Sequence, residues 1–326
     1  MNTNVLKNCD NFAHNIETAA KVYKWDGSYT ATAFAASVER AVDIDDLKRA
    51  KKTVANNTGF LSALGDTAAR IVTAASVVKS SDPDRAIAEI KDVYKILKNY
   101  FIASEYLALA TVIICESGKP ASEMAMRTRK IYDLMKKQHR FLTSSSDIAV
   151  CAILAVSGKD EEYLVEETER CYQYLAKSFS GKGDCLMLSN MLALYDIPAE
   201  AKCCRTIEIR DMLRARGLKV GAYDSSAVLA PLVYASFNED PAMLINEVAE
   251  AEKLMASRRG TGGVWGIGKQ LRTMFAILMV NREFCGSDAS AANAAGAAVT
   301  ALIAEEVAIT CCICSSVAAS CAASSN

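Results

Sequence analysis

Apolar and polar positions along the chain follow a helical period, and one six-residue pattern of them occurs five times. The pattern reads apolar, polar, polar, apolar, apolar, polar, which places its apolar residues on one stripe of a helix. We call it the repeat motif. Its copies begin 38, 40, 38 and 42 residues apart, at Val93–Lys98, Ile131–Lys136, Cys171–Ala176, Ile209–Arg214 and Ala251–Ala256. A recurrence near 40 residues is typical of stacked helical hairpins.

Each interval contains two predicted helices of different character. The first is short and apolar on all sides, which predicts burial on both sides, whereas the second is amphipathic and contains the repeat motif. First helices are expected at Thr67–Val78, Ser104–Cys115, Asp147–Ser157, Asp184–Tyr195 and Ser225–Ser236. Second helices are expected at Pro83–Asn99, Ala121–Gln138, Glu161–Lys177, Ala199–Arg216 and Pro241–Ser257.

The two ends of the chain depart from this pattern, as terminal units of a repeat array do. Predicted helices at 4–24, 29–41 and 43–56 make residues 1–59 an N-terminal cap and first hairpin, and regular repeats occupy residues 60–259. Residues 260–326 are a glycine-rich joint, a helix at Lys269–Asn281 and an Ala/Ser/Cys-rich cap. We therefore predict one elongated all-α domain over residues 1–326, an α-solenoid or right-handed α-α superhelix of about six to seven hairpins.

Composition restricts the location and the partners of the chain. Twelve cysteines without a secretory signal predict free thiols in a reducing compartment, the cytoplasm. A net charge of −1 and a pI near 6.2 give no overall basic field, so we expect no DNA binding. The uncharged run Val307–Asn326 is dominated by Ala, Ser and Cys, which favours a capping helix over stable membrane insertion.

Charge is patterned along the second helices, which begin acidic and end basic. Each arrangement stabilises its own helix dipole. Stacking also brings equivalent helix ends together, so the array should have one acidic and one basic edge. The basic edge is a candidate binding surface for another protein, a phosphate-rich ligand or RNA, although no aromatic residues interleave it as stacking platforms. Its residues are Lys95, Lys98, Lys136, Lys137, Arg140, Arg214, Arg216, Arg258 and Arg259.

The segment Gly263–Gln270 fits the pattern G-x-x-x-x-G-K and opens a predicted helix, where backbone amides can bind a phosphate. Two features argue against a nucleotide site. Gln270 stands where Ser or Thr would bind magnesium, and the preceding element is a predicted helix rather than a strand. We interpret the segment as a joint between repeats and as a candidate binding loop formed by Gly263, Trp265 and Lys269, and we predict no cofactor.

No catalytic constellation emerges, because His14 and His139 lie in different predicted units. Acidic residues near the starts of first helices are explained by N-capping or by the helix dipole. They are Asp66, Glu105, Asp147, Asp184 and Asp224. The cysteine cluster at 311, 312, 314 and 321 is interpreted as small buried residues, because only Cys314 and Cys321 share a helix face, and no metal site is predicted.

The C-terminal stretch Ala301–Thr310, continuing through Ala322–Ser325, resembles the C-terminal signature of a Firmicutes family catalogued as domain of unknown function 4003. Members of that family are about as long as this chain. The resemblance implies a cytosolic bacterial protein without an assigned activity, and it carries over no functional residues.

Three hypotheses follow from these patterns. The favoured one is a non-catalytic cytosolic scaffold that binds another protein through a groove or through the charged edge of the helical stack. The second is an enzyme in which Asp66, Asp147, Asp184 and Asp224 converge on the groove. The third is binding to RNA or to an anionic surface along the basic helix ends, which should weaken steeply with salt.

Overall fold

The computed structural model describes residues 1–24, 40–57, 67–220, 225–263 and 267–284. These residues contain thirteen α-helices, one short 3-10 helix and no strand, which confirms the all-α class. In chain order the elements are α1 (Thr3–Tyr23), α3 (Ile44–Asn57), α4 (Thr67–Val78), α5 (Pro83–Leu97), α6 (Glu105–Ser117), α7 (Ala121–Gln138), α8 (Asp147–Ser157), α9 (Glu161–Leu175), α10 (Lys182–Leu192), α11 (Ala199–Ala215), η1 (Ser225–Val228), α12 (Leu229–Ala235), α13 (Pro241–Ser257) and α14 (Lys269–Phe284).

The helix boundaries lie close to those predicted, because the local capping signals are strong. Asp82, Asp160 and Asp240 each accept a hydrogen bond from a backbone amide in the first turn of α5, α9 and α13, at 3.1, 2.9 and 3.1 Å. Gly118 and Gly158 end α6 and α8 in the left-handed conformation, which glycine adopts without steric cost. The helix predicted at 29–41 falls almost wholly outside the described residues.

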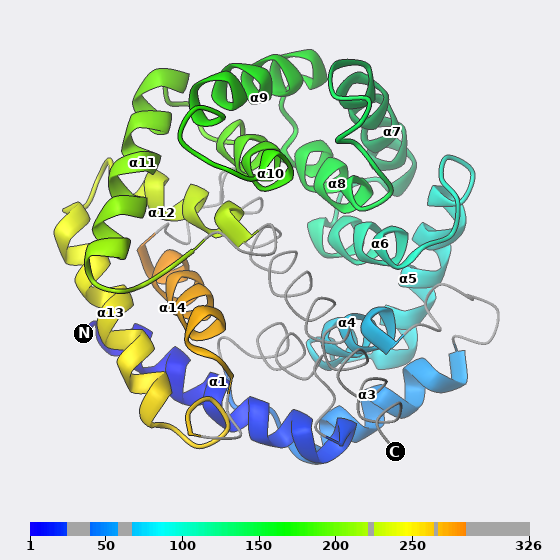
Figure 1. The fold of residues 1–326 in the computed structure, drawn as a ribbon. Helices are drawn as coiled ribbons and strands as arrows, with labels where there is room; N and C mark the ends of the chain where they lie inside the picture. The colour runs from blue at the N-terminus through cyan, green and yellow to red at the C-terminus, as the bar shows by residue number, and fades with distance from the viewer. Residues whose placement is uncertain (25–39, 58–66, 221–224, 264–266, 285–326) are drawn as a thin grey trace, which may run out of the picture.

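The helices form two concentric layers (Figure 1). The apolar first helices α4, α6, α8, α10, α12 and α14 make the inner layer, and the amphipathic helices α1, α3, α5, α7, α9, α11 and α13 make the outer layer. Every residue of α8 is buried, as expected for a helix without a polar face. From α3 to α14, each outer helix packs more extensively on the inner helix that follows it than on the one that precedes it.

The described helices close into a ring, which differs from the elongated array expected from the sequence. Helix α1 packs against both α13 and α14. The ring of Phe12 meets that of Phe275 at 4.7 Å, and Phe12 is only 1% exposed. The terminal ammonium of Met1 lies 2.7 Å from Glu250 Oε2, and the Asn2 amide donates to Glu247 at 2.7 Å. The N-terminal helix therefore completes the outer layer instead of capping a free end.

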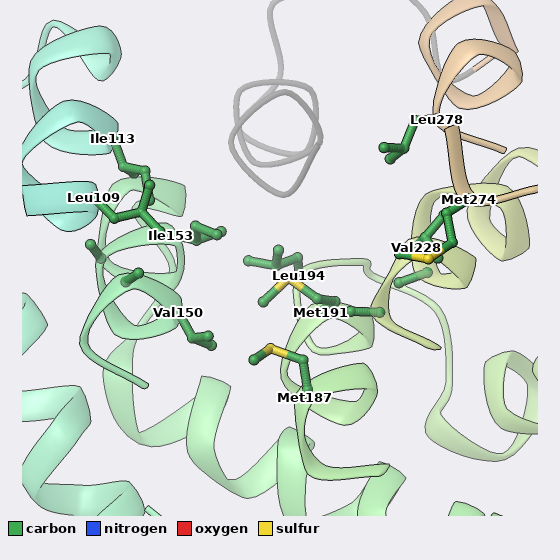
Figure 2. Packing of buried hydrophobic residues seen from close by; sticks show 14 of the residues in the cluster. Leu109, Ile113, Val150, Ile153, Met187, Met191, Leu194, Val228, Met274 and Leu278 are labelled. Atoms are coloured by element: carbon green, nitrogen blue, oxygen red, sulfur yellow. The ribbon is translucent and has the colours of Figure 1, made fainter. Parts of the chain in front are cut away.

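Apolar side chains of the inner layer point toward the centre of the ring (Figure 2). The labelled residues come from α6, α8, η1, α14 and the α10 segment with the turn after it, and all of them are aliphatic or methionine. Ile153, Met191 and Leu278 are fully buried. These side chains of the inner layer thus form core and do not present carboxylates to a central groove.

A series of lysines links successive turns on the face where inner helices end. Lys79, Lys119 and Lys159 follow α4, α6 and α8 at intervals of 40 residues. Each side chain reaches a group 37 residues further on, at the end of the next inner helix. Lys79 Nζ lies 3.0 Å from Glu116, Lys119 Nζ donates to the Val156 carbonyl at 2.7 Å, and Lys159 pairs with Asp196. A lysine near a helix C-terminus also favours the helix dipole.

The position four residues before the repeat motif makes a second link between units in the copies that follow the first. Its residues alternate in charge, as Glu89, Arg127, Glu167, Arg205 and Glu247. Arg127 donates to the Ala155 carbonyl at 3.2 Å and Arg205 to that of Ser236 at 2.8 Å, so each holds the end of an inner helix in the next unit. In the last copy the same position, Glu247, binds the N-terminus of α1 and so closes the ring.

The repeat motif forms the seam between helices at its first and fifth positions, whereas its fourth position, expected there too, is half-buried in four copies and exposed at Tyr174. Its fifth position is buried in every copy, and its first position is buried in all copies except Val93, which is half-buried. The second position is polar in the pattern, but Tyr94 is 1% exposed. In later copies this position contacts the end of the preceding outer helix, in the pairs Tyr132 with Phe101, Tyr172 with His139 and Arg210 with Phe179.

Candidate functional site

The C-terminal ends of the outer helices lie together on one face of the ring. From α3 to α13, neighbouring outer helices run in the same direction, because an inner helix returns the chain between them. The basic residues at the ends of second helices are therefore carried on the outer margin of this face. The same face contains the starts of the inner helices, nearer the ring centre.

Four basic residues of this margin lie at the C-terminal ends of two neighbouring outer helices, α5 and α7, or directly after them. The side chains of Lys98, Lys137 and Arg140 are exposed, and none of these side chains has a hydrogen bond or ion pair with another described residue. Lys136 Nζ lies 3.3 Å from the Tyr132 hydroxyl and over the face of that ring. We call Lys98, Lys136, Lys137 and Arg140 the basic rim.

Three other predicted edge residues have local partners. Lys95 pairs with Asp92 at 2.9 Å, Arg214 lies 3.8 Å from Asp211, and Arg216 donates to the side chain of Asn246. Both ion pairs are exposed, and such pairs contribute only about 0–1 kcal/mol. These residues remain on the surface, but their charges are partly compensated.

The last two predicted edge residues take part in ring closure. Arg258 Nε lies 2.8 Å from Asp10 and Arg259 Nε lies 3.4 Å from Glu17, both on α1. Both were predicted as part of a binding edge, because their partners are nearly 250 residues away in the chain. The structure shows that Arg258 and Arg259 also join α13 to α1.

Two apolar side chains project from the turns beside the basic rim. Phe141 is 96% exposed and Ile102 is 90% exposed, in the turns that follow α7 and α5. We call Ile102 and Phe141 the apolar tips. The α5 turn lies against α7, because Arg129 donates to the Tyr100 carbonyl at 2.8 Å and lies over Phe101. The tips therefore stand on neighbouring turns.

Sequence reasoning did not identify the apolar tips. Ile102 follows Phe101, which is buried, and Phe141 precedes Leu142 in a short apolar pair, so neither differs from its surroundings in composition. The one available signal was position: each lies just beyond the end of an amphipathic helix, next to basic residues.

The candidate binding loop is only partly described. Gly263 has a φ of 77°, a conformation that suits glycine, and α14 begins at Lys269. The preceding Gly262 packs so closely on the end of α13 that a Cβ there would lie 1.9 Å from the Ala256 carbonyl oxygen. The element before the loop is helical, which matches the expected absence of a P-loop context. Trp265 lies outside the described residues.

The acidic residues at the starts of inner helices are bound to backbone or hydroxyl groups. Asp147 accepts a hydrogen bond from the Ser144 amide at 2.8 Å. Asp184 accepts from the Ser226 amide at 2.8 Å and from the Ser226 hydroxyl, so it joins α10 to η1 instead of capping its own helix. Ser104 caps α6 in place of Glu105. Asp66 and Asp224 lie outside the described residues.

One group of three carboxylates, Asp160, Glu161 and Glu162, has oxygens close enough together to hold a cation. The negative charge of these carboxylates is already compensated by basic side chains of the neighbouring helix α7. Glu161 lies 2.8 Å from Arg127 and 3.2 Å from Lys130, and Glu162 lies 2.9 Å from Lys130. Asp160 caps α9. The arrangement therefore serves packing between α7 and α9.

Two further sequence features lie outside the described residues, namely the cysteine cluster 311–321 and the uncharged run Val307–Asn326. Within the part of the chain that the structure describes, no helix has both the length and the apolar character needed to span a bilayer.

The seven described cysteines are free thiols, and they differ in accessibility. Burial raises the pKa of Cys9 and Cys115 to about 12 and that of Cys185 to about 11, so their reactive thiolate forms are scarce near neutral pH. Cys204 is exposed.

We predict that iodoacetamide modifies Cys204 first among the seven described cysteines, as measured by peptide mapping. Labelling of Cys9 or Cys115 at an equal rate in the folded protein would contradict the packing of α1 and α6.

Comparison with known proteins places the chain in a family. A curated relative, "Uncharacterized protein YeaA" of Bacillus subtilis (strain 168), is 31% identical over 108 residues, so the match spans about a third, 32%, of each chain. No solved structure matches the chain. Residues 15–308 match the profile of a family of unknown function, which confirms the family indicated by the sequence resemblance. Because this match extends over most of the 326 residues, the chain belongs to the family described as "Protein of unknown function (DUF4003)".

Proposed function

We propose that this protein is a non-catalytic scaffold that docks on an acidic partner surface through its basic rim. The observation that carries the proposal is the pair of apolar tips, 90% and 96% exposed, beside basic residues without described partners. Leaving a large apolar side chain in water forgoes about 1.5–3 kcal/mol of burial. Such residues beside uncompensated charge are what a docking surface requires.

Two further observations support a binding role over an enzymatic one. The labelled side chains at the ring centre are apolar (Figure 2), and Asp147 and Asp184 are held by hydrogen bonds. Because the described helices close into a ring, we expect the binding surface on a face of the ring and not in a concave groove. We place the protein in the cytoplasm, in keeping with seven free thiols among the described residues.

The test uses recovery of the tagged full-length chain with its partner from native cells under reducing conditions. The double variant Lys137→Glu/Arg140→Glu reverses two charges of the basic rim. We expect it to lose the partner, whether a protein or the membrane fraction, because like charges then face the acidic surface.

The matched control is Lys7→Glu/Lys253→Glu, which makes the same change in net charge at exposed sites on α1 and α13. We expect this control to retain the partner. Equal recovery by wild type and both variants, or equal loss in both, would rule out the basic rim as the docking surface.

A further inference from the structure

We propose that the surface on which the basic rim docks is an anionic lipid bilayer, with Ile102 and Phe141 inserted at its interface. This inference rests on the proposed function and names the class of its partner. It starts from the form of the tips: each side chain is almost fully exposed, so it projects into solvent and does not line a pocket. Side chains of this kind at neighbouring turns can enter the headgroup region together.

The charges around the tips fit a bilayer that bears negative headgroups. Arg140 immediately precedes Phe141, Lys136 and Lys137 stand one helical turn before it, and Lys98 precedes Ile102 by four residues. Long basic side chains at this position extend toward phosphates while their methylene stems lie along apolar surface. Basic residues beside inserted apolar groups are the combination by which peripheral proteins bind anionic membranes.

Several carboxylates on the same face are already bound to other groups. Asp147 and Asp184 are buried and hydrogen-bonded near the starts of the inner helices. The exposed acid closest to the basic rim in sequence, Asp133, is held by Arg129 at 2.9 Å through both carboxylate oxygens. Glu169 pairs with His139 at 2.7 Å. The basic rim therefore presents positive charge that these groups leave uncompensated.

An acidic protein is the alternative partner, and the tips argue against it. Residues that contribute most to protein interfaces are usually surrounded by contacts that exclude water. Here the two tips stand beside charged side chains, an arrangement that a fluid lipid interface accommodates without a complementary pocket. The bilayer is thus the partner that the exposure and the charges favour.

The experiment is co-sedimentation of the purified full chain with two kinds of vesicle, phosphatidylcholine alone and an equal mixture of phosphatidylcholine and phosphatidylglycerol. We expect binding to the anionic vesicles, weak binding to the neutral ones, and loss of binding at high salt. Phe141→Ser should weaken binding by about tenfold or more, and each basic-rim charge removed should weaken it by about fivefold.

The control is Leu6→Ser, which removes a partly exposed apolar side chain from α1 and should bind as wild type does. Circular dichroism and thermal unfolding of Phe141→Ser and Ile102→Ser should match wild type, because both sites are exposed. The Phe141→Trp variant has a tryptophan at this tip, and brominated lipids should quench the fluorescence of that added tryptophan.

Two results would overturn the inference. The first is the absence of binding to anionic vesicles while the charge reversal at Lys137 and Arg140 still removes a protein partner from cells, in which case only the lipid assignment fails. The second is vesicle binding that depends on the basic rim but not on Ile102 or Phe141, which would indicate surface attraction without insertion. Recovery of the cellular partner by Lys137→Glu/Arg140→Glu at the wild-type level would instead refute the proposed function.

Discussion

Replacing Phe12 by alanine is expected to lower the free energy of unfolding by about 3–5 kcal/mol, the range for a large aromatic removed from a core. Phe12 is 1% exposed and meets Phe275 of α14, so the substitution opens a cavity where α1 and α14 join. Urea unfolding monitored by circular dichroism measures the loss.

The matched control for this prediction is Phe141→Ala, the same substitution at a side chain that is 96% exposed. It should change stability by less than about 0.5 kcal/mol. A loss below about 1 kcal/mol for Phe12→Ala would be too small for a core position and would contradict a tightly packed junction of α1 with α14.

Replacing Lys202 by methionine is expected to lower stability by about 3–5 kcal/mol, the cost of breaking a buried ion pair from one side. Lys202 is fully buried on α11, and its Nζ lies 2.7 Å from Glu167 Oε1 on α9. It also donates to the Tyr195 carbonyl at 3.1 Å, at the end of the α10 segment. The substitution therefore removes one of the two basic partners of a buried carboxylate and the side-chain donor to a backbone carbonyl.

A double-mutant cycle separates the pair from the packing around it. Glu167→Gln alone leaves Lys202 charged and buried, whereas Lys202→Met/Glu167→Gln removes both charges. The double variant should lose less stability than the sum of the single losses, with an interaction energy of about 1–3 kcal/mol. Arg170 also contacts Glu167 at 2.7 Å, so the double variant removes this second pair too and regains only part of the lost stability. Additive losses would show that the two residues do not stabilise each other.

Helix positions were predictable from the sequence because local signals determine them. The Asp-Pro and Asp-Glu starts, the glycines after α6 and α8, and the apolar periodicity all act within a few residues. The links between units were also visible in principle, since Lys79, Lys119 and Lys159 are spaced by 40 residues. They were not predicted as links, because single lysines are common in polar turns and do not by themselves indicate a contact.

Ring closure was not predictable in the same way. It depends on the rotation between successive units, which is set by packing and accumulates over the whole chain. The contacts that complete the ring, such as Arg258 with Asp10 and Asn2 with Glu247, join residues 248 and 245 positions apart. For the same reason the basic edge was predicted as one continuous surface, although Arg258 and Arg259 pair with α1 and only part of the edge lacks described partners.

Closure restricts how the length of this chain can change. An open repeat array can gain or lose a unit, because each unit contacts only its neighbours and the ends remain free. Here every unit must supply a fixed share of a full circle, or Phe12 and Phe275 no longer meet. Removing one pair of helices would leave a gap that the others must bend to fill, and adding one would separate the ends. Changes in length are therefore compatible with this architecture in the turns but not in the number of helix pairs.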